Sequence, residues 1–181
     1  MKKIAFLLLV NLLLVNYSLE AQTEKGNWIL GSTLGVYNSN GVEKLSSLNI
    51  DLNVGYFLNP HLAIGLRGVY IHEKSNNNAY DAVGNTLGLG IFGRHYFLEK
   101  KIKPFLDLNV GYQHTNIKWE DTSLYSFHYH TNYGLGLNYF ITQRIAVEGI
   151  FRFNAEYFDF SFREMLTISN RDARIGLQVL F

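Results

Sequence analysis

The chain has 181 residues, a formal net charge of +1 at pH 7 and no cysteine, and 48% of its residues are hydrophobic. The lack of cysteine excludes disulfides and thiolate chemistry. The near balance of basic and acidic residues argues against a nucleic-acid partner, because such a partner would require a clear basic excess.

The N-terminal segment is predicted to be a signal peptide over 1–21. Two lysines precede an apolar run over 4–15, and Leu-Glu-Ala at 19–21 resembles a cleavage site. A run of about a dozen apolar residues is typical of a signal peptide and too short to span a bilayer as a helix; a retained membrane anchor is the alternative. The remainder, 22–181, is predicted to form one domain, and it has no apolar stretch of about 18 residues that would indicate a transmembrane helix.

One pattern repeats along the remainder of the chain. Segments of about ten residues alternate apolar residues with polar residues or glycine, and turn-forming stretches separate them, which predicts β-strands. No convincing amphipathic helix period occurs after residue 22. The expected strands are 27–37, 47–57, 62–72, 85–97, 105–118, 127–140, 145–156 and 171–181.

The connections between these strands alternate in length. Those after the second, fourth and sixth strands are short, as in 58–61 and 141–144, whereas those after the odd-numbered strands are longer and polar, as in 73–84. Short turns at one end and longer loops at the other are typical of transmembrane barrels. We therefore predict an all-β fold: a closed, antiparallel, eight-stranded up-and-down transmembrane β-barrel with both termini at the turn end.

The composition of the two strand faces indicates which side meets lipid. One face is bulky and aliphatic, whereas the other is polar and rich in glycine, which suits the narrow interior of an eight-stranded barrel. The lysines beyond the signal lie at strand ends or in turns, since a lysine at the lipid midplane costs about 2–4 kcal/mol. A soluble, lipocalin-like barrel with an apolar interior is the alternative. The glycines expected to face inward are Gly31, Gly35, Gly55, Gly65, Gly88, Gly90, Gly111, Gly134, Gly136 and Gly176.

Aromatic residues gather in two groups that are separated by aliphatic residues. Such groups are typical of the aromatic belts that membrane barrels place at both interfaces. The belt beside the short turns is expected to contain Tyr56, Phe57, Tyr96, Phe97, Tyr139 and Phe140. The belt towards the long loops is expected to contain Tyr37, Tyr70, Tyr112, Trp119, Tyr129 and Tyr157.

The last strand and the terminal aromatic residue resemble the assembly signal of bacterial outer-membrane barrels. Leu177, Val179 and Phe181 fall on the apolar face of this strand, and Gly176 falls on the other. Together with the signal peptide and the eight alternating strands, this strand makes the chain similar to the small outer-membrane β-barrel family that includes OmpX and the transmembrane domain of OmpA, a porin-like domain. The resemblance implies location in the outer membrane, contact with its lipid and lipopolysaccharide, and recognition by the barrel assembly machinery. The Gln22 start and the asparagine-rich loops resemble members from Bacteroidota.

A network of charged residues is expected inside the barrel. Simple hairpin registers place Arg67 opposite Asp51 or Asn53, and they place Arg94 opposite Asp107. The network is predicted to comprise Asp51, Arg67, Arg94, Asp107, Glu148, Arg152 and Arg174.

The last three residues of that network are expected to interact with one another. Glu148 lies near Arg152 on its own strand and is predicted to reach Arg174 on the next. The network has two interpretations. Rings of charge form selectivity filters in pores, whereas paired charges of both signs satisfy the buried polar groups of a filled lumen. The near balance of signs and the narrow barrel favour a structural plug.

Ser126, His128, His130 and Glu156 form the candidate site for chemistry, at the expected external mouth. His-X-His with a carboxylate is a set that can hold a metal ion, and Ser, His and Glu together are a set that can perform acyl transfer. The alternative, which we favour, is a polar rim without catalysis. No phosphate-binding glycine loop, EF-hand or HExxH motif is present, so no catalytic, cofactor or metal residue is assigned.

The expected external rim is rich in aromatic residues. Apolar positions switch from odd to even after residue 157, which predicts a β-bulge near Tyr157–Phe158. An exposed aromatic cluster marks either a contact with a partner or an extended membrane belt. The rim residues are Trp119, Tyr125, Phe127, Tyr129, Tyr133, Tyr157, Phe158, Phe160 and Phe162.

The sequence therefore favours a barrel that is not an enzyme and carries no cofactor. We expect it to support the membrane, or to contact a surface protein or a host ligand through its external loops. A narrow pore for small solutes or ions is one alternative, and a lipid A-modifying acyl hydrolase or transferase is another.

Overall fold

The computed structural model describes residues 23–40, 44–77, 80–98, 100–119, 122–160 and 163–181. The side chains of these residues are described except within 38–44, 76–80 and 155–171. These residues form eight β-strands in an all-β arrangement. The strands are β1 (Trp28–Asn40), β2 (Lys44–Asn59), β3 (Leu62–Asn77), β4 (Tyr80–Tyr96), β5 (Ile102–Trp119), β6 (Thr122–Phe140), β7 (Ile145–Phe160) and β8 (Arg163–Leu180). No helix among the described residues has the length and apolarity needed to cross a membrane.

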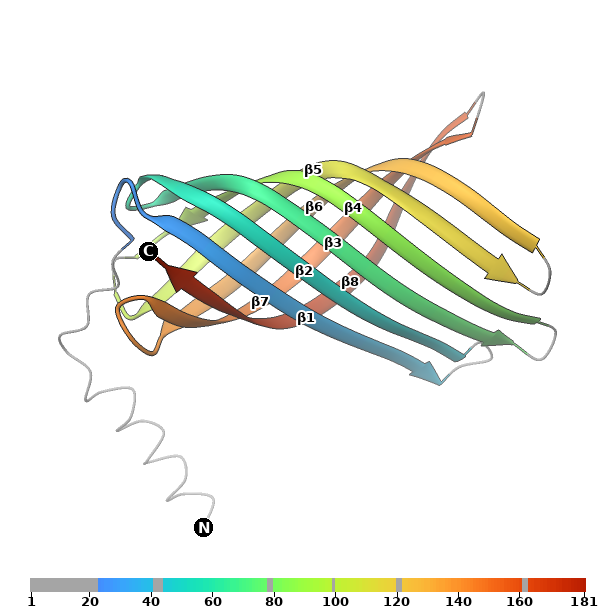
Figure 1. Cartoon of the computed structure of the whole chain (residues 1–181), viewed down its shortest axis with the longest axis horizontal. Helices are drawn as coiled ribbons and strands as arrows, with labels where there is room; N and C mark the ends of the chain where they lie inside the picture. Colours follow the sequence, from blue (N-terminus) through green and yellow to red (C-terminus); the bar gives the residue numbers. More distant parts are fainter. Residues whose placement is uncertain (1–22, 41–43, 78–79, 99, 120–121, 161–162) are drawn as a thin grey trace, which may run out of the picture.

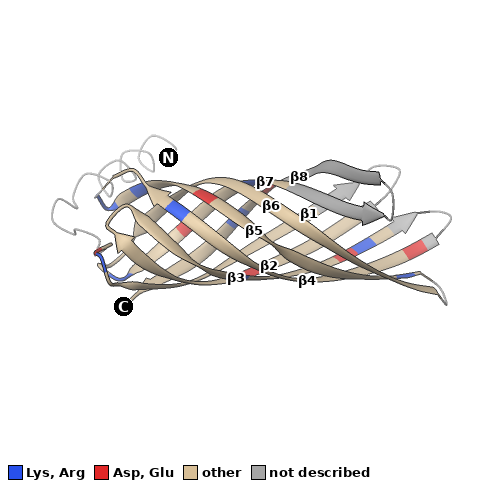
Figure 2. Ribbon diagram, turned by 90° about the horizontal axis from the view of Figure 1, so that it is seen from above, with Lys and Arg blue, Asp and Glu red and all other residues tan. Residues whose placement is uncertain are grey.

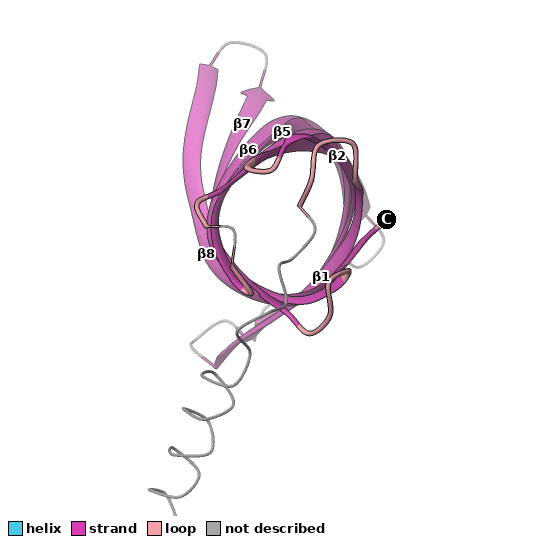
Figure 3. Cartoon of the chain, turned by 90° about the vertical axis from the view of Figure 1, so that its left-hand side faces the viewer, coloured by secondary structure: helices cyan, strands magenta, loops and turns pink. Residues whose placement is uncertain are grey.

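The strands form a closed antiparallel barrel. Each strand pairs with the next along the chain, and β1 also pairs with β8, matching 29–34 with 175–180. Figure 3, which looks along the barrel, shows the strands as a ring, and Figure 1 shows their common tilt. The connections after β2, β4 and β6 lie at the end that also holds Phe181, termed here the turn end (Figure 1). The opposite end is termed the far end.

The strands are longer at the far end than the sequence predicts. The expected loop 73–84 mostly continues β3 and β4, where Lys74 pairs with Val83 and Glu73 pairs with Gly84. The prediction of long external loops is therefore wrong. Beyond the membrane neither face of a strand must be apolar, so pairing continues there without the alternation that would reveal it.

The predicted faces of the strands are confirmed. Outward side chains such as Leu89 and Ile175 are 64% and 71% exposed, as a surface solvated by lipid requires. The ten glycines named above face inward, because a Cβ added to any of them would meet an interior side chain or the backbone of a facing strand. At Gly55, for example, the added atom would lie 2.8 Å from Cζ of Phe92. Added at Gly68 it would meet nothing within 4 Å, because Gly68 faces outward.

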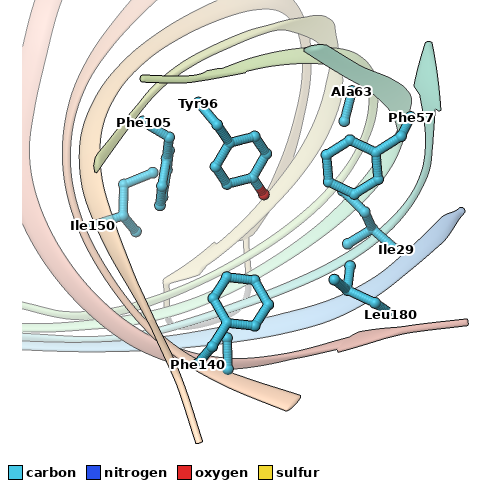
Figure 4. Close-up of a cluster of buried hydrophobic side chains, with 9 residues drawn as sticks. Ile29, Phe57, Ala63, Tyr96, Phe105, Phe140, Ile150 and Leu180 are labelled. Atoms are coloured by element: carbon cyan, nitrogen blue, oxygen red, sulfur yellow. The ribbon is translucent and has the colours of Figure 1, made fainter. Parts of the chain in front are cut away.

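The predicted aromatic belt at the turn end is wrong for half of its members. Successive residues of a strand point to opposite faces, so of each adjacent pair one ring must turn inward. Phe57, Tyr96 and Phe140 are fully buried inside the barrel, whereas Phe97 is 49% exposed on the outside. Figure 4 shows the buried rings converging within the ring of strands. This apolar cluster comprises Ile29, Phe57, Ala63, Tyr96, Phe105, Phe140, Ala146, Ile150 and Leu180.

The predicted β-bulge is displaced. The pairing of β6 with β7 runs without interruption through Tyr157 and Phe158. The irregularity lies instead between Phe153 and Asn154 in the pairing of β7 with β8, where Asn170 is the extra residue of β8. The parity switch in the sequence therefore does not mark the position of the bulge. The side chains of 155–171 lie outside the described set.

Candidate functional site in the lumen

A first cluster of ion pairs crosses the lumen from β3 and β4 to β5 and β7. Arg67 donates two hydrogen bonds to the carboxylate of Asp107, of 2.7 and 2.8 Å. Arg94 donates through Nε to the same carboxylate at 3.0 Å and binds Glu148 through both terminal nitrogens, at 2.5 and 3.1 Å. All four side chains are at most 2% exposed. One carboxylate therefore joins two guanidinium groups that belong to neighbouring strands.

A second cluster joins β2, β7 and β8. The carboxylate of Asp51 accepts hydrogen bonds from both Arg152 and Arg174. Arg174 also donates to Asp172, two residues earlier on β8, from Nε at 2.9 Å and from Nη2 at 2.5 Å. Asp172 was not predicted as a lumen residue. It lies near the start of the expected strand 171–181, where apolar and polar residues do not yet alternate clearly. Together the two clusters contain four guanidinium and four carboxylate groups. Figure 2 marks the basic and acidic residues along the strands in blue and red.

The predicted members of the network are buried as expected, but several predicted partners are wrong. Arg94 faces Asp107 in the register and binds it, as predicted. Arg67 faces Asn53, one of its two predicted neighbours, yet its ion pair is with Asp107. Register identifies only neighbours on adjacent strands, whereas an arginine side chain is long enough to reach across so narrow a lumen.

The predicted contacts of Glu148 with Arg152 and Arg174 are replaced by its contact with Arg94. Arg152 and Arg174 bind Asp51 instead. Glu148 and Arg152 lie on the same face of β7, but the carboxylate finds its partner on β4 across the lumen.

Aromatic rings line the first cluster. The guanidinium of Arg94 lies 4.0 Å from the ring centroid of Phe105, and that of Arg67 lies 4.9 Å from that of Phe92. Such contacts favour the charged arginine by about 0.5–2 kcal/mol each. Phe92 and Phe105 occupy the space left by inward glycines, since added Cβ atoms at Gly55 and Gly65 would lie 2.8 Å from the Phe92 ring.

Towards the turn end the lumen becomes apolar and then polar again. The Tyr96 hydroxyl lies 3.3 Å from Oε1 of Gln178, which also accepts a hydrogen bond from Asn138. Lys103 is fully buried and donates to the hydroxyl of Thr23, a buried residue of the segment before β1. The inward positions of Lys103 and Tyr96 were not predicted. Lys103 is four residues from Asp107 on β5, and this even spacing, which places both side chains on the same face, could have indicated its inward position.

The candidate rim residues are only partly brought together. His128 and His130 are buried on the inward face of β6, where their Nε2 atoms lie 3.0 Å from Gln113 and 2.8 Å from Asn109. Glu156 faces His130 in the register of β6 and β7, and its side chain lies outside the described set. Ser126 faces Thr115 on β5. Among the described side chains no group of three or more metal-binding residues occurs.

The residues of the expected assembly signal lie on the strand that closes the barrel. Leu177, Val179 and Phe181 are exposed on the outside, and Gly176 faces Thr33 on the inside. The backbone N–H of Phe181 donates to Trp28 at 3.1 Å, and the N–H of Trp28 donates to Phe181 at 2.7 Å. The end of β8 is thus tied to the start of β1.

A closed eight-stranded antiparallel barrel with an aliphatic exterior and buried charges inside is a membrane-spanning barrel of the outer-membrane type. The sequence matches the family described as outer membrane protein beta-barrel domain over residues 6–181. The chain belongs to this family, and its location is the outer membrane. Strand β1 begins and strand β8 ends at the turn end (Figure 1), and an outer-membrane barrel with an even number of strands has both ends of its strand order on the periplasmic side. The turn end therefore faces the periplasm.

Solved structures share the fold. Neisserial surface protein A aligns with a TM-score of 0.58 at 14% identity, covering 87% of this chain and 98% of that one. The N-terminal β-barrel domain of OprF from Pseudomonas aeruginosa gives 0.54 at 15% identity, with the same coverage. OprG from the same organism gives 0.56 at 12% identity, covering 91% of this chain and 99% of that one. A comparison with curated proteins finds no match.

Proposed function

We propose that the protein is a non-conducting outer-membrane barrel, in which the lumen is sealed by ion pairs and an apolar cluster and the biological role is carried by the outside of the barrel. The observation that carries this proposal is the arrangement of the four arginines, each of which binds a carboxylate on a different strand or across the lumen. Pairs of this kind join opposite walls and leave no single-sign ring for a passing ion.

The apolar cluster supports the same proposal at the turn end. Its four aromatic rings are at most 1% exposed, and the Tyr96 ring lies 5.6 Å from Phe57 and 5.7 Å from Phe105. Close-packed rings with gaps smaller than a water molecule oppose both water and ions. An ion crossing the barrel would have to displace this cluster as well as break the ion pairs.

A narrow pore is the second candidate, and one observation favours it. Nε of Arg67 and both Nε and Nη2 of Arg152 are buried without a hydrogen-bond partner among the described residues. Buried polar atoms of this kind are usually satisfied by water. Some lumenal water is therefore compatible with both candidates, and only a continuous water path would make a pore.

Planar-bilayer recording of the refolded protein distinguishes the two. We expect no stable single-channel conductance from the unmodified barrel. Stable conductance whose cation-to-anion selectivity changes in Arg94→Glu would overturn the sealed lumen in favour of the pore. Lys118→Glu, at an exposed position near the end of β5, is the control for a general change of charge.

An acyl hydrolase or transferase acting on lipid A is the remaining alternative, and its candidate residues are those of the rim. The Nε2 atoms of His128 and His130 lie within hydrogen-bond distance of the side-chain amides of Gln113 and Asn109, which are neither nucleophiles nor bases. We therefore infer that the protein is not an enzyme of this kind. Release or transfer of acyl chains from lipid A by the purified barrel, lost in His130→Ala, would contradict this inference.

A further inference from the structure

A groove of about 690 Å³ crosses the outside of the barrel over β3, β4, β5 and β6. Its floor is formed at Gly90, Gly111 and His130, which face inward and leave only backbone on the outside. Two rows of outward side chains form its walls. One row is Leu66, Ile91, Val110 and Thr131, and the other is Leu89, Tyr112 and Tyr129.

The groove rises along the membrane normal as it crosses the strands. On β3 it begins at Leu66, four residues from the turn-end start of the strand, whereas on β6 it reaches Thr131, nine residues from the turn-end limit of that strand. The turns beside β3 and β6 lie at the same end of the barrel (Figure 1). The groove therefore leads from the inner half of the membrane towards its external interface.

A continuous stack of rings begins where the groove ends. We name as the aromatic ladder the outward residues Tyr112, His114, Tyr125, Phe127 and Tyr129 of β5 and β6. The Phe127 ring lies 5.8 Å from Tyr112 and 4.4 Å from His114, and the His114 ring is parallel to that of Tyr125 at 5.8 Å. Tyr125, Phe127 and Tyr129 are each more than half exposed.

The ladder extends beyond the hydrocarbon region. Tyr129 and Tyr139 are ten residues apart on β6. A strand tilted by about 40° rises by roughly 25 Å over this distance, which is the height of the apolar band of such barrels. Tyr139 lies at the turn-end interface, with Lys101 over its ring at 4.9 Å. Tyr129 is thus at the external interface, and Phe127 and Tyr125 lie outside it, at the level of lipid headgroups.

We propose that the groove and the aromatic ladder together bind a glycolipid of the outer leaflet, with an acyl chain in the groove and the saccharide against the ladder. The groove is apolar and lies within the hydrocarbon band, so a chain is the ligand it fits. The faces of aromatic rings are negative and attract the C–H groups on the face of a sugar ring. The headgroups of phosphatidylglycerol and phosphatidylethanolamine have no such ring.

The polar groups of the ladder fit the same ligand. The ladder carries a histidine and tyrosine hydroxyl groups that can hydrogen-bond sugar hydroxyls. Lys118 continues the same outward row of β5 and supplies a cation near a phosphate on the saccharide. The ladder is continuous with the lipid-facing surface through Tyr112 and Tyr129, which belong to both features. This inference goes beyond the sealed lumen and does not depend on it.

The test is native mass spectrometry of the refolded barrel released from detergent micelles. The probes are purified rough-type lipopolysaccharide, which has lipid A and core sugars, and phosphatidylglycerol. We expect the barrel to retain lipopolysaccharide in preference to phosphatidylglycerol. Thr131→Phe, which fills the groove, is expected to reduce retention about tenfold, whereas Ser32→Phe, at a small outward position on β1, is not. Thr131→Leu is a milder variant with the same purpose.

The ladder is tested separately. Tyr125→Ala with Phe127→Ala is expected to reduce retention of lipopolysaccharide about tenfold without changing that of phosphatidylglycerol, and Phe97→Ala, an exposed ring at the turn end, is the control. Equal retention of both lipids overturns the proposal in favour of a groove for any acyl chain. Retention that survives both the groove and the ladder variants, or no retention of either lipid, also overturns it. Conductance plays no part in these outcomes.

Discussion

Arg67 and Asp107 lie on β3 and β5, which are not neighbours in the sheet, yet they form a bidentate ion pair of 2.7 and 2.8 Å across the lumen. The same carboxylate accepts a hydrogen bond from Arg94 on the strand between them. Through these contacts Asp107 connects its own strand β5 to both β3 and β4 inside the barrel. Removing one member of such a buried set leaves a charge without its partner, and this loss is more destabilising than the absence of the whole set.

The first prediction concerns this pairing. Asp107→Ala and Arg94→Ala are each expected to lower the free energy of unfolding by about 3–5 kcal/mol, because each leaves buried charge uncompensated. The double variant is expected to lose about 1–3 kcal/mol less than the sum of the two, because the Arg94–Asp107 contact is lost only once, whereas Arg67 and Glu148 lose their bidentate partners. Urea unfolding of the barrel in detergent measures all three values. Lys118→Ala, at an exposed position, is the control and should stay within about 0.5 kcal/mol of the unmodified protein. Single losses below that value for Arg94 and Asp107 would mean that the pair is solvated.

The second prediction compares two glycines on neighbouring strands. An added Cβ at Gly55 would lie 2.8 Å from the Phe92 ring and 3.0 Å from a backbone oxygen, whereas at Gly68 it would meet nothing within 4 Å. Gly55→Ala is therefore expected to destabilise the barrel by about 1–3 kcal/mol through overpacking. Gly68→Ala should be neutral or slightly stabilising, since alanine also has less freedom to lose on folding. Equal effects in urea unfolding would show that Gly55 does not face a packed lumen.

The third prediction tests the placement of the membrane. Leu135 lies near the middle of the outward face of β6, and Tyr125 lies on the same face beyond the external interface. The two variants to compare are Leu135→Arg and Tyr125→Arg. The first is expected to cost about 2–4 kcal/mol in a lipid bilayer, and the second about 0–1 kcal/mol. Refolding into phospholipid vesicles with urea titration measures the difference. Equal costs at the two positions would contradict the assignment of the apolar band.

The alternation of apolar and polar residues with a period of two predicted most of this fold, and the errors arise where this alternation is absent. Leu89, Ile91 and Arg94 could be assigned to faces from parity alone, because lipid requires an apolar exterior along the whole band. Outside the band that requirement ends. The far portions of β3 and β4 therefore pair through polar residues such as Lys74, which the sequence could not distinguish from a loop.

The partners inside the lumen could not be read from the sequence for a different reason. Parity identified Arg67 and Glu148 as inward residues, and register supplied their neighbours on adjacent strands. Their ion pairs with Asp107 and Arg94 depend instead on the distance across the barrel, which follows from strand number and stagger. The inward position of Tyr96 was available from parity, but its aromatic character suggested a membrane belt.

The last prediction uses Tyr96 and its neighbour to test the seal at the turn end. Tyr96 is fully buried between Phe57 and Phe105, and its hydroxyl lies 3.3 Å from Gln178, whereas the adjacent Phe97 is 49% exposed on the outside. Tyr96→Ala is expected to lower the free energy of unfolding by about 3–5 kcal/mol, as large-to-small core substitutions of aromatic residues do. It should also produce a small but measurable conductance in planar bilayers, because the cavity left at the centre of the cluster admits water and the ion pairs are then the remaining barrier to an ion.

Phe97→Ala, which removes a ring of similar size one residue away, is expected to leave the lumen sealed. Heat-dependent migration on gels establishes that both variants are folded. If folded Tyr96→Ala remains silent while the unmodified barrel is also silent, the ion pairs alone are sufficient to seal the lumen. The apolar cluster would then serve stability only, and combining Tyr96→Ala with Arg94→Ala would be the variant expected to conduct.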